Sequence, residues 1–121
     1  MVDVEISNLI DRLYDIISGR KGEPRKWWLF DEISHPQNRM CVITKKDRGV
    51  NNIEFLSNSE FIEHYITSFD DPAPDFYEYQ VDFEMVKCGS VIHVLSTYES
   101  KYKPEDDKPF KKGVNSIQIM F

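Results

Sequence analysis

From Phe76 onward the period of the hydrophobic pattern changes to two, and this change constrains the fold more than any other feature. Before it, apolar residues recur at helical spacing in three segments. After it, apolar and polar residues alternate, which is the pattern of a half-buried strand. Gly89 interrupts the alternation inside a short turn sequence, so strands over 76–87 and 90–102 are expected to form a hairpin. Helices followed by paired strands predict an α+β fold.

Two helices are predicted in the first part of the chain. An apolar stripe predicts a helix over residues 4–18, with Asp3 as its N-cap and Gly19 at its end. A second, shorter helix is expected from Pro24, which suits a first helical turn, to His35-Pro36. Because this helix is apolar nearly all round, we expect it to be buried on most sides.

The remaining elements follow from turn and capping residues. Asp47-Arg48-Gly49 predicts a turn between two strands, and Ser57 with Glu60 forms a capping box. In order, we expect a strand over 39–46, a short strand over 51–55, a helix over 58–69, a linker over 70–74 and a last strand over 112–121.

The hairpin register decides which side chains face the helices. With Cys88 and Gly89 as the central turn residues, Met85 opposes Ile92 and Glu84 opposes His93. The face predicted to meet the helices carries Tyr77, Tyr79, Val81, Phe83, Met85, Ile92, Val94, Ser96 and Tyr98. The other face carries Glu78, Gln80, Asp82, Glu84, Val91, His93, Leu95, Thr97 and Glu99. A slip of one residue would exchange these two sets.

Composition and charge exclude several classes of protein. A chain of 121 residues fits a single domain, 1–121. A net charge of −6 argues against a nucleic-acid partner, and the basic cluster around Arg25 is expected to be a solvated loop. The N-terminus has no basic segment typical of a signal peptide, and no apolar run is long enough to span a membrane. With only Cys41 and Cys88, we expect a reduced, cytoplasmic protein that does not bind a membrane.

The element order resembles that of the nuclear transport factor 2-like superfamily. The segments that carry the resemblance are Leu13-Tyr14-Asp15, Trp28-x-Phe30 with His35-Pro36, Leu56-Ser57 with Glu60-Phe61-Ile62, then 83–86, 89–94, 96–99 and 113–118. The resemblance implies a cone-shaped roll, with about three helices packed on a curved, mixed but mainly antiparallel sheet and an apolar pocket at one end. It does not imply one function, because the superfamily includes ketosteroid isomerases, polyketide cyclases and transport factors.

One departure from the family pattern bears on assembly. Members usually have a further strand after the one that ends at Phe121 here. An unpaired edge beside Ile117 and Ile119 would be a liability, so we expect a neighbouring chain to complete it in a homodimer formed through the sheet.

Three residues are candidates for catalysis. Tyr14 lies where a helix-one tyrosine of the ketosteroid isomerase branch helps to hold an oxyanion, and the alternative is a core tyrosine with a satisfied hydroxyl. The carboxylate base that this activity needs early in the first strand is absent from 39–43. His93 opposite Glu84 forms the best acid–base pair, although both point away from the helices in the predicted register. The histidines are too scattered for a metal site, and no cofactor is predicted.

An aromatic-lined pocket inside the cone is the main functional prediction. Its expected lining is Tyr14, Trp27, Trp28, Phe30, Tyr79, Met85, Tyr98 and Asn115. Such a surface suits a small apolar or cyclic ligand. Two alternatives remain open: a non-enzymatic dimerisation or interaction module with a filled pocket, and an isomerase- or cyclase-like enzyme.

Overall fold

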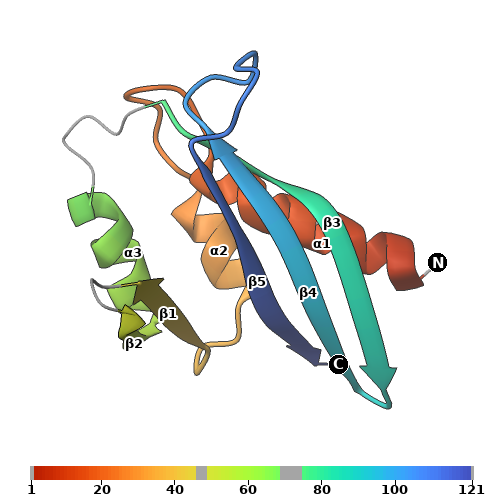
Figure 1. Ribbon diagram of the computed structural model, residues 1–121. Helices are drawn as coiled ribbons and strands as arrows, with labels where there is room; N and C mark the ends of the chain where they lie inside the picture. The colour runs from red at the N-terminus through yellow and green to blue at the C-terminus, as the bar shows by residue number, and fades with distance from the viewer. Residues whose placement is uncertain (1, 46–48, 69–74, 121) are drawn as a thin grey trace.

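The computed structural model describes residues 2–45, 49–68 and 75–120. The described residues form three helices and two antiparallel sheets, which confirms the α+β fold (Figure 1). The elements are α1 (Val2–Ile17), α2 (Trp27–Ile33), β1 (Arg39–Lys45), β2 (Asn51–Ser57), α3 (Asn58–Ser68), β3 (Tyr77–Cys88), β4 (Val91–Lys101) and β5 (Lys111–Met120). The predicted order is therefore confirmed. The predicted turn at 47–48 and linker at 70–74 lie outside the described residues.

Helix α1 lies across one face of the β3–β4–β5 sheet (Figure 1). Its apolar stripe supplies Ile6, Ile10 and Tyr14 to a core that also contains Ile92 and Val94 from β4. Burying an isoleucine side chain stabilises a fold by about 1.5–3 kcal/mol, so the contact between α1 and β4 contributes strongly to the stability of this core. The helix begins at Val2, so Asp3 lies within its first turn and the prediction of Asp3 as N-cap is wrong.

The C-terminal end of α1 is closed by groups from three other parts of the chain. Its last carbonyl oxygens accept hydrogen bonds as follows: Tyr14 O from Ser18 Oγ at 2.9 Å, Asp15 O from Ser18 N at 3.2 Å, Ile16 O from Lys26 N at 3.3 Å and Ile17 O from Tyr65 Oη at 2.7 Å. The carbonyls that a helix end leaves free are thus satisfied without a left-handed glycine cap. Gly19 instead pairs with Phe76 next to β3.

Helix α2 is less buried than predicted. It begins at Trp27 rather than near Pro24, and only Phe30 is buried, while Trp28 is 64% exposed. A helix this short packs on one side, where Phe30 stacks on Phe61 of α3 at a ring-centroid distance of 5.6 Å. Helix α3 itself starts at the predicted capping box, in which Glu60 N donates to Ser57 Oγ at 3.1 Å and Ser57 N donates to Glu60 Oε1 at 2.9 Å.

The strands form two sheets rather than the predicted single mixed sheet. Strands β1 and β2 pair in one, and the order in the other is β3-β4-β5, all antiparallel. Within the described residues, every strand except β4 is therefore an edge strand. In Figure 1, α3 and the β1–β2 pair lie to one side of the three-stranded sheet.

The predicted hairpin register is wrong by two residues. Gly89, at φ 59°, and Ser90 form the turn, so Cys88 pairs with Val91. His93 consequently faces Val86 rather than Glu84, which faces Leu95. Since side chains alternate with a period of two, this error leaves the predicted face of each residue from Asp82 onward unchanged.

A β-bulge at Val81 changes the faces of the residues before it. Gln80 pairs with Tyr98 and Asp82 with Thr97, so Val81 is the extra residue and is 48% exposed. The predicted inward positions of Tyr77, Tyr79 and Val81 are therefore wrong. Glu78 and Gln80, predicted to point outward, share the face of Ser100 and Tyr98.

We call the side of the β3–β4–β5 sheet that faces α1 the inner face, and the opposite side the outer face. The inner face carries Glu78, Gln80, Phe83, Met85, Lys87, Ile92, Val94, Ser96, Tyr98, Ser100, Lys111, Gly113, Asn115, Ile117 and Ile119.

Candidate ligand-binding site

The inner face is divided into an apolar half and a polar half. Toward the β3–β4 turn, cross-strand neighbours such as Met85, Val94 and Ile117 pack against α1. Toward the other end, polar side chains replace them. We call the following set the inner-face cluster: Tyr14, Glu78, Gln80, Ser96, Tyr98 and Asn115. A few polar groups beside an apolar surface are typical of ligand sites.

A directed chain of hydrogen bonds runs through the cluster. Asn115 Nδ2 donates to Tyr14 Oη at 3.0 Å, and Tyr14 Oη lies 2.8 Å from Ser96 Oγ. Ser96 Oγ donates its single proton to Gln80 Oε1 at 2.6 Å. The hydroxyl proton of Tyr14 must therefore point to Ser96. Tyr14 and Ser96 are buried, so the bond between their hydroxyls is formed away from water.

The same bonds define what Tyr14 can do chemically. Burial raises the pKa of the Tyr14 hydroxyl, and its hydrogen bonds with Ser96 and Asn115 only partly oppose this effect. The hydroxyl is thus neutral near pH 7. Since its proton is given to Ser96, Tyr14 has no second proton with which to hold an oxyanion in this arrangement.

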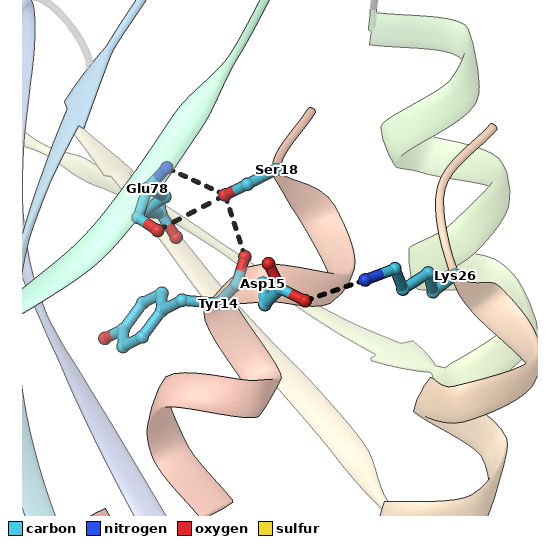
Figure 2. A network of polar contacts seen from close by, with 5 residues as sticks. All are labelled: Tyr14, Asp15, Ser18, Lys26 and Glu78. Carbon is cyan, nitrogen blue, oxygen red and sulfur yellow. Dashed lines mark hydrogen bonds and ion pairs between the residues drawn. The ribbon is translucent and has the colours of Figure 1, made fainter. Parts of the chain in front are cut away.

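Ser18 fixes the backbone of Glu78 (Figure 2). Glu78 N donates to Ser18 Oγ at 2.9 Å, and the same hydroxyl lies 3.3 Å from Glu78 O and 2.9 Å from Tyr14 O. The end of α1 and the start of β3 are therefore joined through one side chain. Together with the bulge at Val81, this contact sets the direction of the Glu78 carboxylate.

The Glu78 carboxylate is held in a half-buried, aromatic environment. Ser100 Oγ, fully buried, donates to Glu78 Oε1 at 2.8 Å. Burial raises the pKa of Glu78 above its ordinary value, while Ser100 and the Lys111 ammonium act in the opposite direction. Burial also raises the pKa of Tyr98, and the negative charge of Glu78 adds to that effect. The carboxylate is thus close enough to the tyrosine rings to act on them electrostatically.

Asn115 on β5 lies on an accessible side of the cluster. Ser96 on β4 is completely buried, whereas its β5 neighbour Asn115 is only half-buried. In the part of the chain that the structure describes, the only recorded contact of the Asn115 amide is its bond to Tyr14. No buried side-chain polar atom among the described residues is left unsatisfied, so the rest of this amide is accessible to solvent or to a ligand.

Gly113 makes room for the ring of Tyr98. The two residues are cross-strand neighbours, and a β-carbon at Gly113 would collide with the Tyr98 side chain. Tyr98 can therefore lie flat over β5, 6.1 Å from Tyr14 between ring centroids. A glycine in mid-strand usually marks such a close approach.

The structure brings together half of the predicted pocket lining. Tyr14, Met85, Tyr98 and Asn115 all belong to the inner face or contact it. The other predicted residues lie elsewhere: Trp27 and Phe30 pack in an aromatic cluster with Tyr65 and Phe61, Trp28 is exposed, and Tyr79 donates to Glu99 on the outer face.

The predicted acid–base pair is not formed. His93 and Glu84 both lie on the outer face, as predicted, but they are not cross-strand partners. His93 Nε2 instead lies 2.7 Å from Ser116 Oγ on β5. Both side chains are exposed, which does not favour a tuned general base.

A separate depression of about 410 Å³ lies beside the end of α1. It is lined by Asp15, Ser18, Gly19, Arg20, Glu23, Pro24, Lys26 and Tyr77, none of which was predicted to line a pocket. Its walls carry both signs of charge, and Lys26 forms an ion pair with Asp15 at 2.9 Å (Figure 2). The nearby Arg25 is buried against Tyr65 and backbone carbonyls, so the basic cluster is not a free patch of cations.

Sequence reasoning missed Glu78, Gln80 and the role of Ser96. The available signal was on β4, where Ser96 and Ser100 continue the apolar alternation of Ile92 and Val94. A small polar residue at a buried position requires a partner, and the partners are the displaced β3 residues.

Among the described residues, no group of three or more His, Cys, Asp or Glu side chains could hold a metal ion. The described helices include none with the length and apolar character needed to cross a bilayer. No protein family, curated protein or solved structure matches the chain.

Proposed function

We propose that this chain is a small-molecule-binding domain whose site is the inner-face cluster. The observation that carries the proposal is the half-buried Asn115 amide at the end of the Tyr14–Ser96–Gln80 hydrogen-bond chain, beside the apolar half of the inner face. A ligand could lay an apolar ring on the half-buried Ile117, two residues along β5, and exchange hydrogen bonds with Asn115. The chain of bonds behind it fixes the orientation of that amide in advance, which lowers the cost of binding.

The resemblance to the nuclear transport factor 2-like superfamily supports the proposal. Members of that superfamily bind small molecules inside a cone formed by a sheet curved around helices. In this chain, Ile92, Val94 and Ser96 of β4 are buried, whereas the inner-face residues of β5 from Gly113 onward are half-buried, which is compatible with an opening on the β5 side. We therefore propose a cone-like interior that opens beside Asn115.

Binding without catalysis is the form of the proposal that the geometry favours. The Tyr14 hydroxyl donates its proton to Ser96. His93 and Glu84, the predicted acid–base pair, are exposed and are not cross-strand partners. Rigid, neutral hydrogen-bonding groups suit recognition more directly than proton transfer.

The test is a titration with a neutral bicyclic alcohol, 2-naphthylmethanol, followed by 1H–15N correlation spectra. For a ligand of this size a Kd on the order of 0.1–1 mM is reasonable. We expect saturable shifts at Gly113, Asn115 and Ile117, and their loss in Asn115→Leu. Ser116→Ala, on the outer face of the same strand, is the matched control and should bind normally. Absence of saturable shifts, or shifts confined to the outer face, would refute the proposal.

A second candidate function, self-association through the sheet, is favoured by the outer face. There Val86, Val91, Leu95, Val114 and Met120 are 67%, 40%, 40%, 60% and 68% exposed. Val91 and Met120 are cross-strand partners, and exposed apolar side chains gathered on one face of a sheet favour an interaction surface there. We propose a homodimer that covers this face. Sedimentation of the wild type should then give twice the chain mass and Leu95→Lys a monomer, while a monomeric wild type at 100 μM would contradict it.

A further inference from the structure

We propose that the ligand of the inner-face site is an organic cation, an amine attached to an apolar ring, and that Glu78 is the group that selects its charge. This inference rests on the proposed binding function and adds the chemical class of the ligand. It follows from the position of Glu78, from the state of its carboxylate oxygens and from the cation that already lies on Tyr98.

Glu78 is the one carboxylate on the inner face of the described sheet. Its Oε1 accepts from Ser100, and no contact is recorded for Oε2 among the described residues. Since none of the described buried polar atoms lacks a partner, Oε2 is open to solvent. An acceptor oxygen in a half-buried site, with one free side, is suited to a charge-assisted hydrogen bond from an ammonium group.

The tyrosine beside Glu78 already accommodates a cation. Lys111 Nζ lies 5.9 Å from the centroid of the Tyr98 ring, and its charge acts on Glu78. Lys111 is an exposed residue at the start of β5, so its ammonium can leave this place for water. A ligand amine can take the same place between the carboxylate and the ring, where a cation gains from both. The net charge of −6 also favours cationic over anionic ligands.

The preference for a cation should depend on pH in a defined direction. At low pH Glu78 is protonated and the amine gains nothing from it; at higher pH the carboxylate is charged and the gain is complete. The other titratable groups that act on Glu78 or are acted on by it are Tyr14 of α1, Tyr65 of α3, Tyr98 of β4 and Lys111 of β5. Burial raises the pKa of each of the three tyrosines, so they keep their protons between pH 5 and 8 and the change is assigned to Glu78.

The experiment compares two probes of equal size, 2-naphthylmethanol and 2-naphthylmethylamine, by calorimetry at pH 5 and pH 8. We expect the amine to bind about tenfold more tightly than the alcohol at pH 8 and by a smaller factor at pH 5. Glu78→Gln retains an oxygen for Ser100 and should abolish the preference for the amine over the alcohol. Glu99→Gln removes the same charge from the outer face and should leave the preference intact. Lys111→Met, which removes the competing ammonium, should strengthen the amine alone.

The outcomes separate the two proposals. Binding of the alcohol with no preference for the amine, or a preference that survives Glu78→Gln, overturns the inference and leaves the binding function standing. Failure of both probes to bind a folded wild-type protein overturns both.

Discussion

The buried hydroxyl of Tyr14 provides the sharpest test of the hydrogen-bond chain. Tyr14→Phe removes one oxygen that accepts from Asn115 and donates to Ser96. Each net hydrogen bond contributes about 0.5–1.5 kcal/mol, so the variant should lose about 1–3 kcal/mol of unfolding free energy. The lower part of that range is expected, because Asn115 is half-buried and its amide can turn to water.

The direction of the chain makes Ser96→Ala the more costly change. It leaves the Tyr14 proton without an acceptor and Gln80 Oε1 without a donor, each at a cost of about 1–3 kcal/mol. In the double variant the Tyr14 hydroxyl is absent, so no buried proton is left without an acceptor and that cost disappears. The double variant should therefore be more stable than the sum of the single losses predicts, by about 1 kcal/mol or more.

Urea unfolding followed by tryptophan fluorescence measures all three free energies by linear extrapolation. Tyr79→Phe is the matched control, because its hydroxyl donates at 3.2 Å to Glu99 on the outer face and should be worth less than about 0.5 kcal/mol. Losses from Tyr14→Phe and Ser96→Ala that add within about 0.5 kcal/mol would show that the two hydroxyls are not coupled, and the directed chain would be wrong.

Three further predictions concern Gly113 and Glu78 on the inner face and Ser57 at the start of α3. Gly113→Ala should destabilise the protein by about 1–3 kcal/mol in urea unfolding, because its β-carbon would collide with the Tyr98 ring, and Tyr98→Ala should offset part of that loss. Burial raises the pKa of Glu78 above 4.5, so the folded state holds a proton that the unfolded chain releases. The unfolding free energy of the wild type should then fall as pH rises from about 4.5 through the raised pKa. A plot of Tm against pH should show this fall for the wild type and not for Glu78→Gln. Ser57→Ala should cost about 1 kcal/mol in urea unfolding by removing the cap of α3, and an unchanged midpoint would contradict the capping role.

Much of the fold was predictable because short-range signals are strong in this chain. The stripe of α1, the capping box of α3 and Gly89 are each determined by a few neighbouring residues. The division into two sheets was not predictable in this way. Pairing between distant strands depends on how the helices pack beneath them, and no local pattern states that β1 and β5 remain edges.

The candidate site was only half predictable. Tyr14 and Asn115 were found because of their residue types, and the structure joins them directly. Glu78 and Gln80 were assigned to the outer face because apolar residues alternate without interruption through Val81. A bulge leaves no mark in such a pattern when the extra residue is itself apolar and follows the alternation.

Deletion of Val81 tests this explanation, and the bulge predicts that the deletion will change little. In the bulged strand Asp82 points outward and Gln80 inward, so removing the residue between them leaves a regular alternation with Glu78 and Gln80 still inward. Val81 is 48% exposed, so the deletion should cost only about 1 kcal/mol or less. In a strand without a bulge, the same deletion would move Glu78 from the outer face to the inner face. An NMR titration of the Glu78 carboxyl distinguishes the two: a raised pKa in both proteins supports the bulge, whereas a pKa raised only in the deletion variant would mean that Tyr79, and not Glu78, belongs to the inner face.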